Sequence, residues 1–359
     1  MNIKDSTGKL YYVGGCVRDE ILGVPSVDID ICVEGDAIKY VQEQNLEIIK
    51  TQENIRTARV LIEGKEIDFA STRKESYPQK GHLPIVTEVG CSLDEDLLRR
   101  DFTINSIAKS VMTGEIYDTT NGLEDLKAKI LRVHHDNSFI DDPTRIIRGL
   151  KFSIRFGFNL DERTKNLQNQ YLENVNYDMS YSRLKKELID TFNLNSQDAI
   201  ERFINEKIYK LISPQIEKLP KLKIKPLIDE FHIKEAWLIY LGWLDLSRLE
   251  LTKDEKKIIT DYHLLSKLQP DTDDFTIYKI CSKMEIESVI LWSIMGGNGL
   301  KYLREHRHIK PHLNGNDIIN LGYSGQDIGK ILDKIIQNKL INPNMTKAQE
   351  LELIQKWTF

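Results

Sequence analysis

The periodicity of apolar residues changes near residue 135, and this change constrains the fold more than any other feature. Before it, apolar residues alternate or form short branched runs, which is the pattern of strands. After it, apolar residues recur at three- and four-residue spacing, which is typical of amphipathic helices. The strands expected are 11–15, 27–35, 58–71 (a hairpin) and 115–120. The helices expected are 143–158, 181–192, 199–212, 235–246 and 326–340. The sequence therefore predicts an α+β domain followed by a helical remainder.

Composition places the chain among ordinary globular proteins, and its 359 residues are enough for two or more domains. We expect no membrane helix and no signal peptide, because no apolar run reaches ~18 residues and the first ten residues are polar. The four cysteines lack C-x-x-C spacing, so we expect a reduced, cytoplasmic protein. A net charge of −5 argues against a protein that coats nucleic acid. Local basic patches at 218–226 and 301–312 remain open to either RNA binding or plain solvation.

Two carboxylates, Asp28 and Asp30, flank one isoleucine within an apolar run that is expected to be a buried strand. Residues i and i+2 of a strand share a face, so both carboxylates can converge on Mg²⁺, which takes carboxylate and phosphate oxygens together. Paired magnesium ions activate a hydroxyl and neutralise a leaving pyrophosphate. The spacing alone is a weak signal, since one aspartate capping a turn after residues 25–27 explains it equally well.

The preceding segment strengthens the nucleotide interpretation. Gly14 and Gly15 lie between a predicted strand and a predicted helix, where backbone N–H groups approach a phosphate closely. Arg18, at the start of that helix, can add a charge-assisted contact. A third acid, Asp68, lies in the second arm of a hairpin whose turn is expected at residues 63–64. Asp68 either assists deprotonation of an attacking hydroxyl or is a structural residue.

Five motifs in this order resemble the class II tRNA nucleotidyltransferase and bacterial poly(A) polymerase family: GGCVRD, DIDICVEGD, IDFASTRKESY, DLLRRDFTINSIA and DDPTRIIRGLKF. They cover residues 11–160, and a weaker similarity to CCA-adding members lies at 312–335. The resemblance implies a polymerase-β-like head with an all-helical neck, body and tail that hold tRNA. We expect the head at 1–135, the neck at 136–190, the body at 191–280 and the tail at 281–359.

The resemblance also implies site residues. It assigns Asp28 and Asp30 to two magnesium ions, and Gly15 and Arg18 to nucleotide binding. Arg100 would contact the incoming nucleotide. Asp101 and Asn105 would select ribose over deoxyribose.

Asp142 and Arg145 resemble the family's base-reading pair. An aspartate accepts a hydrogen bond from the exocyclic amine of cytosine or adenine, which uracil lacks, and an arginine donates to the ring. Asp142 before Pro143 is also a good helix N-cap, so it can serve both roles. Arg148 continues the same helix face toward the nucleotide, and Lys151 follows it.

Three residues depart from the family pattern. Asp141 stands where a glutamate is usual, which shortens the side chain that braces the motif. Lys151 stands where an arginine is common, which replaces a planar fork with a point charge. Arg56 replaces a glycine, and the sequence offers no physical account of that change.

The family reading predicts stepwise addition of C, C and A to tRNA 3′ ends from CTP and ATP, with Mg²⁺ as cofactor and the protein as a monomer. A-adding activity beside a separate CC-adding enzyme is the alternative, since YPQKGHLP partly matches A-adding enzymes. The full-length segment 72–102 argues against a CC-only enzyme, and poly(A) synthesis is less favoured. Two further hypotheses place the function elsewhere: an RNA-binding protein with an inactive head, or a nucleotidyltransferase that acts on small molecules. Intact Asp28 and Asp30 argue against the first, and the large helical region argues against the second.

Overall fold

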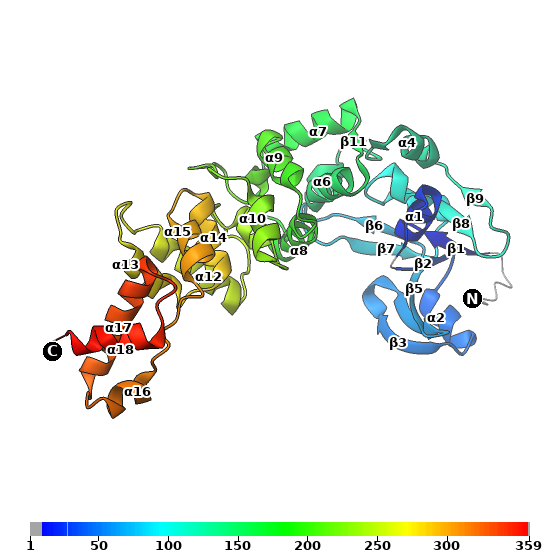
Figure 1. The fold of residues 1–359 in the computed structure, drawn as a ribbon. Helices are drawn as coiled ribbons and strands as arrows, with labels where there is room; N and C mark the ends of the chain where they lie inside the picture. Colours follow the sequence, from blue (N-terminus) through cyan, green and yellow to red (C-terminus); the bar gives the residue numbers. More distant parts are fainter. Residues whose placement is uncertain (1–8, 27, 358–359) are drawn as a thin grey trace. The chain divides into compact units, whose positions relative to one another are not determined.

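The computed structural model describes residues 9–26 and 28–357 and forms two compact units, Met1–Gln215 and Ile216–Phe359 (Figure 1). The first unit holds a mixed sheet and its covering helices. The second unit is built from helices throughout its described residues. The predicted change from mixed to mainly helical structure is therefore confirmed, whereas the four domain boundaries stay a prediction.

The main sheet has seven strands in the order β3-β4-β5-β2-β1-β8-β9. Only β2 and β5 run parallel, and all other neighbours are antiparallel. The strands are β1 (Leu10–Val13), β2 (Asp30–Val33), β3 (Glu47–Gln52), β4 (Thr57–Ile62), β5 (Lys65–Ser71), β8 (Ala108–Ser110) and β9 (Ile116–Tyr117). A separate hairpin joins β6 (Arg73–Ser76) to β7 (Ile85–Val89), and β10 (Ile130–Leu131) pairs in parallel with β11 (Asn159–Leu160).

The β4–β5 hairpin forms as predicted. Glu63 and Gly64 have φ of 51° and 76°, the two positive angles of the turn that matches strand twist. One face of this sheet packs on α2 (Ala37–Glu43) through Ile31, Ile67 and Phe69, which are fully buried. The other face carries Asp30 and Asp68, because side chains alternate along a strand.

The prediction of a buried strand across both acids is wrong for Asp28. Strand β2 begins only at Asp30, and Asp28 lies before it with an exposed side chain. Ser26 Oγ donates to the backbone oxygen of Asp28, and the predicted turn at residues 25–27 includes residue 27, which lies outside the described residues. Gly14 (φ 70°) precedes α1 (Gly15–Leu22), as the glycine pair predicted. The strand expected at 115–120 is reduced to the two residues of β9.

Helices complete the first unit. They are α3 (Leu93–Leu98), α4 (Gly122–Ala128), α5 (Ser138–Asp141), α6 (Thr144–Phe156), α7 (Glu162–Glu173), α8 (Tyr181–Phe192) and α9 (Gln197–Asn205), with short turns η1 (Glu53–Ile55), η2 (Thr103–Asn105) and η3 (Ile208–Leu211). The single helix predicted over 199–212 is wrong, because Lys207 adopts a left-handed conformation (φ 60°) between α9 and η3. Strand β11 likewise makes the region after 135 largely, rather than entirely, helical.

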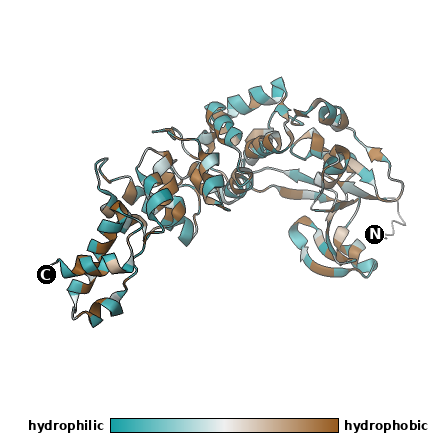
Figure 2. Cartoon of the chain, viewed as in Figure 1, coloured by the Kyte–Doolittle hydropathy of each residue, from teal (hydrophilic) through white to brown (hydrophobic). Residues whose placement is uncertain are grey.

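The second unit contains α10 (Ile224–Phe231), α11 (Trp237–Leu241), α12 (Lys253–Leu265), α13 (Asp274–Cys281), α14 (Ile286–Ile294), α15 (Gly299–Lys301), η4 (Tyr302–His306), α16 (Gly315–Asn320), α17 (Gln326–Ile341) and α18 (Lys347–Gln355). The helix predicted over 235–246 shortens to α11, whereas α17 matches its prediction. Figure 2 shows hydrophilic and hydrophobic residues mixed along these helices. Within the described part of the chain, no helix is long and apolar enough to span a membrane.

Candidate active site

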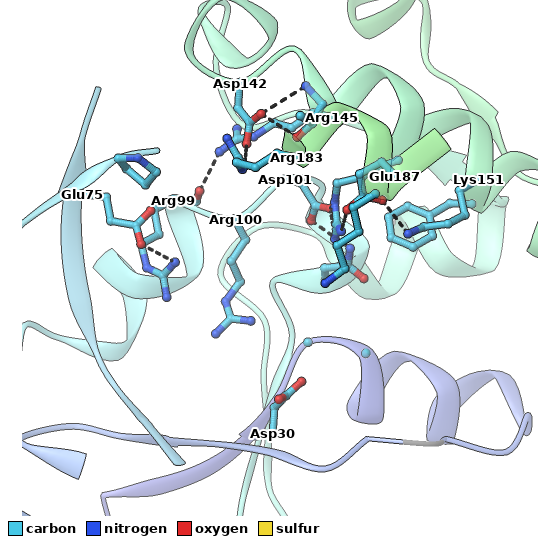
Figure 3. Close-up of a pocket in the computed structure, with 18 of the residues that line it drawn as sticks. Asp30, Glu75, Arg99, Arg100, Asp101, Asp142, Arg145, Lys151, Arg183 and Glu187 are labelled. Atoms are coloured by element: carbon cyan, nitrogen blue, oxygen red, sulfur yellow. Dashed lines mark hydrogen bonds and ion pairs between the residues drawn. The ribbon is translucent and has the colours of Figure 1, made fainter. Parts of the chain in front are cut away.

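A cavity of about 750 Å³ in the first unit brings distant motifs together. Its walls come from the start of α1, the residues before β2, the segment around η2, and helices α6 and α8. Figure 3 shows Asp30 on one side, Asp142 and Arg145 on the other, and Arg100 between them. All predicted site residues but Asp68 line it: Gly14, Gly15, Arg18, Asp28, Asp30, Arg100, Asp101, Asn105, Asp142, Arg145, Arg148 and Lys151.

The carboxylates of Asp30 and Asp68 lie on neighbouring strands, directly opposite each other in the parallel β2–β5 ladder. Burial raises the pKa of Asp30, and the negative charge of Asp68 raises it further, while Arg100 opposes both effects. A cation would relieve this repulsion, and Asp28 opens into the same cavity. The described residues contain no preformed group of three or more metal-binding side chains. This donor set fits Mg²⁺, which proteins hold through one or two carboxylates plus substrate phosphates.

Asp68 faces a neighbouring cavity of about 410 Å³, which it shares with Asp30. Arg59 holds both of its oxygens, with Nε and Nη2 each 2.8 Å from one of them. The carboxylate therefore already has an ion-pair partner. Both predicted roles of Asp68, assistance in deprotonating the attacking hydroxyl and a purely structural role, stay predictions.

The Nε of Arg100 is a hydrogen-bond donor available to a ligand. Its Nη2 donates to Asp96 Oδ2 at 2.9 Å, but its buried Nε has no hydrogen-bond partner in the described structure. A buried donor left unpaired costs free energy, so a ligand that accepts from it is favoured. Gly14 has φ +70°, so a side chain there would be strained, and its Cβ would also lie 3.1 Å from Arg100 Nη1.

Arg18 is more enclosed than the sequence suggested. Its Nη1 donates to Asn105 Oδ1 at 2.6 Å, its Nε and Nη2 bind Asp19, and its guanidinium packs on Phe152 and Phe156. Only 4% of the residue is exposed. In this structure Arg18 therefore positions Asn105 through the bond from its Nη1.

A chain of polar contacts continues from Asn105 to the helices. Asn105 Nδ2 donates to Asp101 Oδ1, and Arg148 Nε donates to Asp101 Oδ2, both at 2.8 Å. Burial opposes ionisation of Asp101, but the charge of Arg148 and the bond from Asn105 hold its pKa well below the usual range. Glu187 on α8 then accepts from both Arg148 (3.0 Å) and Lys151 (2.6 Å). Much of the positive charge of this wall is thus balanced.

The predicted base-reading pair is fully engaged. Asp142 Oδ1 accepts from the Thr144 backbone N–H at 3.1 Å and its hydroxyl at 2.6 Å. The prediction of Asp142 as the N-cap is wrong by one residue, because α6 begins at Thr144 and Pro143 occupies the N-cap position. Its Oδ2 pairs with Arg183. Arg145 donates to Ser138 Oγ at 2.7 Å and to the backbone oxygen of Arg99 at 3.0 Å. The base-reading role itself stays a prediction.

The unusual residues find local partners. Asp141 pairs with Lys80 Nζ at 2.5 Å, and Lys151 pairs with Glu187. Arg56 has φ 49° and ψ 56°, a left-handed conformation that favours glycine, which explains why a glycine is usual there. Ion pairs with Asp36 and Glu53 offset this strain.

Sequence reasoning missed several cavity residues. Arg73 and Arg99 both donate to Glu75, and Arg183 and Glu187 extend from α8. Arg73 and Glu75 lie within the motif IDFASTRKESY, and Arg99 lies within DLLRRDFTINSIA, but the sequence alone assigned them no role. A signal was also present on α8, where Arg183 and Glu187 are four residues apart and thus share a helix face.

Comparisons with known proteins agree with this geometry. Residues 10–132 match the poly A polymerase head domain. The A-adding tRNA nucleotidyltransferase of Halalkalibacterium halodurans is 28% identical over 87% of this chain and 80% of its own length. That of Geobacter sulfurreducens is 27% identical over 96% of this chain, but the chain spans only 44% of that relative. The CCA-adding enzyme of Lactobacillus helveticus is 27% identical, over 93% and 89% of the two chains.

Solved structures extend the similarity to the whole fold. An apo CCA-adding enzyme has a TM-score of 0.80 at 27% identity, covering 97% of this chain and 91% of that one. The Thermotoga maritima CCA-adding enzyme complexed with tRNA has a TM-score of 0.77 at 26% identity, covering 97% and 90%. The polymerase-β-like head and the family resemblance are therefore confirmed.

Proposed function

Since the chain carries a poly A polymerase head domain and is related to the tRNA nucleotidyltransferases, which are enzymes, we propose that it adds C, C and A to tRNA 3′ ends. CTP and ATP are the donors and pyrophosphate is released. The observation that carries the proposal is the single cavity lined by acids, phosphate-binding groups and the Asp142–Arg145 pair. A protein that only bound RNA would gain nothing from Asp30, whose charge is disfavoured where it stands.

The nucleotide is held by this chain's own groups. The triphosphate lies against the Gly14–Gly15 backbone at the start of α1, with Arg100 Nε as an added donor. Asn105 and Asp101 bind the ribose hydroxyls, in the orientation that Arg18 and Arg148 impose on them. Asp142 and Arg145 contact the base, which requires them to exchange their present protein partners for it.

The chemical step is an in-line displacement. The oxygen of the tRNA 3′-hydroxyl forms a bond to the α-phosphorus, and the bond from that phosphorus to the β-phosphate oxygen breaks. Magnesium held by Asp28 and Asp30, with Asp68 beside them, would lower the pKa of the hydroxyl and neutralise charge on the pyrophosphate. The side chains contribute chiefly by positioning the reactants and by balancing charge.

A-only addition is the second candidate. It is favoured by the relatives from Geobacter and Halalkalibacterium, both named A-adding tRNA nucleotidyltransferases. Full CCA addition is favoured by the Lactobacillus relative and by the similarity in fold to CCA-adding enzymes. Both candidates share the same cavity and the same chemistry.

One experiment separates them. Purified protein is incubated with Mg²⁺, CTP and ATP and with three tRNA transcripts that end at the discriminator base, at C and at CC, and the 3′ ends are sequenced. Extension of all three to CCA supports the full activity. Extension of the CC-ending transcript alone supports A addition, long A tails support poly(A) synthesis, and no extension contradicts the proposal. Asp30→Asn is the inactive control.

A further inference from the structure

Four charged side chains form one row across four strands of the main sheet. Lys50 on β3 is directly opposite Arg59 on β4, Arg59 is opposite Asp68 on β5, and Asp68 is opposite Asp30 on β2. Residues paired in this way project from the same sheet face. Two positive charges therefore lead directly to the two acids of the candidate active site.

An irregularity in β3 places Lys50 in this row. The register shifts between Ile48 and Lys50, so Ile49 is an extra residue and Lys50, rather than Ile49, lies opposite Arg59. Bulges of this kind re-aim side chains and are common beside active sites. Like charges directly opposite each other are destabilising, and this arrangement therefore favours the binding of an anion. Lys50 is exposed and forms no ion pair with the residues that the structure describes.

The row lines the second cavity, of about 410 Å³, which we call the acceptor cavity. Besides the charged residues, its lining consists of uncharged side chains: Val13, Gln52, Thr57 and Ala70. A volume of this size lies within the range of ligand sites. The acceptor cavity shares four residues with the nucleotide cavity: Asp30, Arg73, Arg99 and Arg100. The two cavities thus meet at Asp30 and at three arginines.

We propose that the acceptor cavity binds the terminal nucleotide of the RNA that is extended, with its last phosphodiester on Lys50 and Arg59. The inference rests on the proposed nucleotidyl transfer, in which the attacking hydroxyl and the triphosphate must meet at the acids. A phosphate on Lys50 and Arg59 places the terminal ribose toward Asp68 and Asp30, one strand further along the row. Arg59 then divides its charge between that phosphate and Asp68, to which it is bidentate.

The test removes the negative charge of the last linkage of the RNA and, separately, the positive charge of Lys50. A tRNA minihelix ending in CC is prepared with either a normal or a methylphosphonate last linkage, which is uncharged, and A addition is measured. In the wild type, the uncharged linkage should lower kcat/KM about tenfold, mainly through KM, as expected for loss of one charge-assisted contact. Lys50→Ala should lose part of the activity on the normal minihelix, and the uncharged linkage should cause a smaller further loss than in the wild type, because Arg59 still contacts that linkage. Arg59→Lys, which keeps a positive charge, should retain part of the sensitivity of kcat/KM to the uncharged linkage.

The matched control is Lys39→Ala, an exposed lysine of the same domain on α2, which packs on the opposite sheet face. It should respond to the modified linkage as the wild type does. Thermal unfolding of Lys50→Ala should match that of the wild type, since Lys50 is exposed. If Lys50→Ala remains as sensitive to the uncharged linkage as the wild type, the acceptor-cavity proposal is wrong. If Lys50→Ala instead weakens only inhibition by pyrophosphate, the cavity serves the leaving group and the proposal is equally wrong.

A second readout does not depend on catalysis. Binding of both minihelices is measured by fluorescence anisotropy, without nucleotide or metal. The wild type should bind the normal minihelix several-fold more tightly than the modified one, and Lys50→Ala should reduce this difference, with the remainder due to Arg59. That result, together with no nucleotide addition by the wild type, would contradict the proposed function while supporting the acceptor cavity. Equal binding of both minihelices by the wild type would overturn the acceptor cavity alone.

Discussion

Arg183 on α8 holds Asp142, the acid that precedes α6, by an ion pair to its Oδ2. The same guanidinium donates to the backbone oxygen of His82 at 3.4 Å, in the segment that joins β6 to β7. The orientation of the predicted base-reading acid is thus set by a residue 41 positions further along the chain.

Replacing Arg183 should therefore weaken nucleotide discrimination. In Arg183→Ala, Asp142 keeps its Thr144 bonds but loses the partner that directs its other oxygen. We expect KM for ATP and CTP to rise about tenfold and addition of U and G to increase, because an ion pair of this kind contributes roughly 1–3 kcal/mol. Arg202→Ala, which removes a comparable ion pair with Glu206 outside the cavity, is the control. Unchanged discrimination in Arg183→Ala would contradict this role.

Asp30→Asn should abolish nucleotide addition and yet stabilise the metal-free protein. The folded-state pKa of Asp30 is raised, by burial first and then by Asp68, so the ionised form destabilises the fold at neutral pH. By linkage, the wild type loses stability as pH rises through that pKa, and the variant does not. Melting temperatures at pH 7 without and with Mg²⁺ measure the effect. The control Glu43→Gln, on an exposed pair, should leave both activity and melting temperature unchanged.

Gly81→Ala should loosen the segment between β6 and β7. Gly81 has φ +80°, and a Cβ there would lie 2.9 Å from Met179 Cβ and 3.0 Å from the Asp178 backbone oxygen. We expect a loss of roughly 1–3 kcal/mol in the free energy of unfolding and faster proteolysis of residues 77–84. Gly23→Ala separates the two causes, because Gly23 has φ +68° but nothing within 4 Å of its Cβ. Equal losses in both variants would show that backbone strain, rather than the clash, is responsible.

The second unit depends on a buried ion pair between Lys339 and Glu350, whose side chains are 4% and 0% exposed. Glu350 also accepts from the backbone N–H groups of His312 and Leu313. Glu350→Gln should lower the free energy of unfolding by roughly 3–5 kcal/mol, since one buried charge loses its partner. Asp327→Asn, on the exposed pair with Lys330, should cost well under 1 kcal/mol. Urea unfolding of the full chain measures both variants.

The same pair predicts acid sensitivity. Burial opposes ionisation of Glu350, but the His312 N–H and Lys339 together lower its folded-state pKa below the unfolded value. The contribution of Glu350 to the free energy of unfolding is therefore complete above its unfolded-state pKa of about 4.3, and it is lost as pH falls through its folded-state pKa. Urea midpoints measured from pH 6 to pH 3 should fall less steeply in Glu350→Gln than in the wild type. Parallel slopes would argue against this role.

Protonation of His134 adds a second acid-dependent loss of stability, at higher pH than that of Glu350. Burial lowers its pKa to about 4, and the ring accepts or donates a 2.7 Å hydrogen bond with Ser106 Oγ. Because the unfolded ring binds a proton near pH 6.5, stability should fall as pH drops from about 6.5 toward 4. His134→Gln should flatten that part of the curve. His263→Gln, at an exposed histidine of α12, should not change it.

Local sequence determined part of the secondary structure, chiefly its strongest turns and amphipathic helices. The β4–β5 hairpin follows from Glu63 and Gly64, and α6 ends at Gly157, which adopts φ 71°. Such signals act between neighbours in the chain, so they are readable without tertiary context. The motif order likewise predicted twelve of the residues that line the nucleotide cavity, because each motif carries its own chemical pattern.

Tertiary structure decided what those groups can do. Asp68 was identified as an acid, but only the pairing of β4 with β5 places Arg59 on both of its oxygens. Lys50 drew no attention in the sequence, because its position opposite Arg59 depends on a one-residue bulge in β3. Arg183 and Glu187 reach the cavity only because α8 packs against α6. Residue types and spacing are local properties of the sequence, whereas the partner of each charge is set by contacts between distant segments.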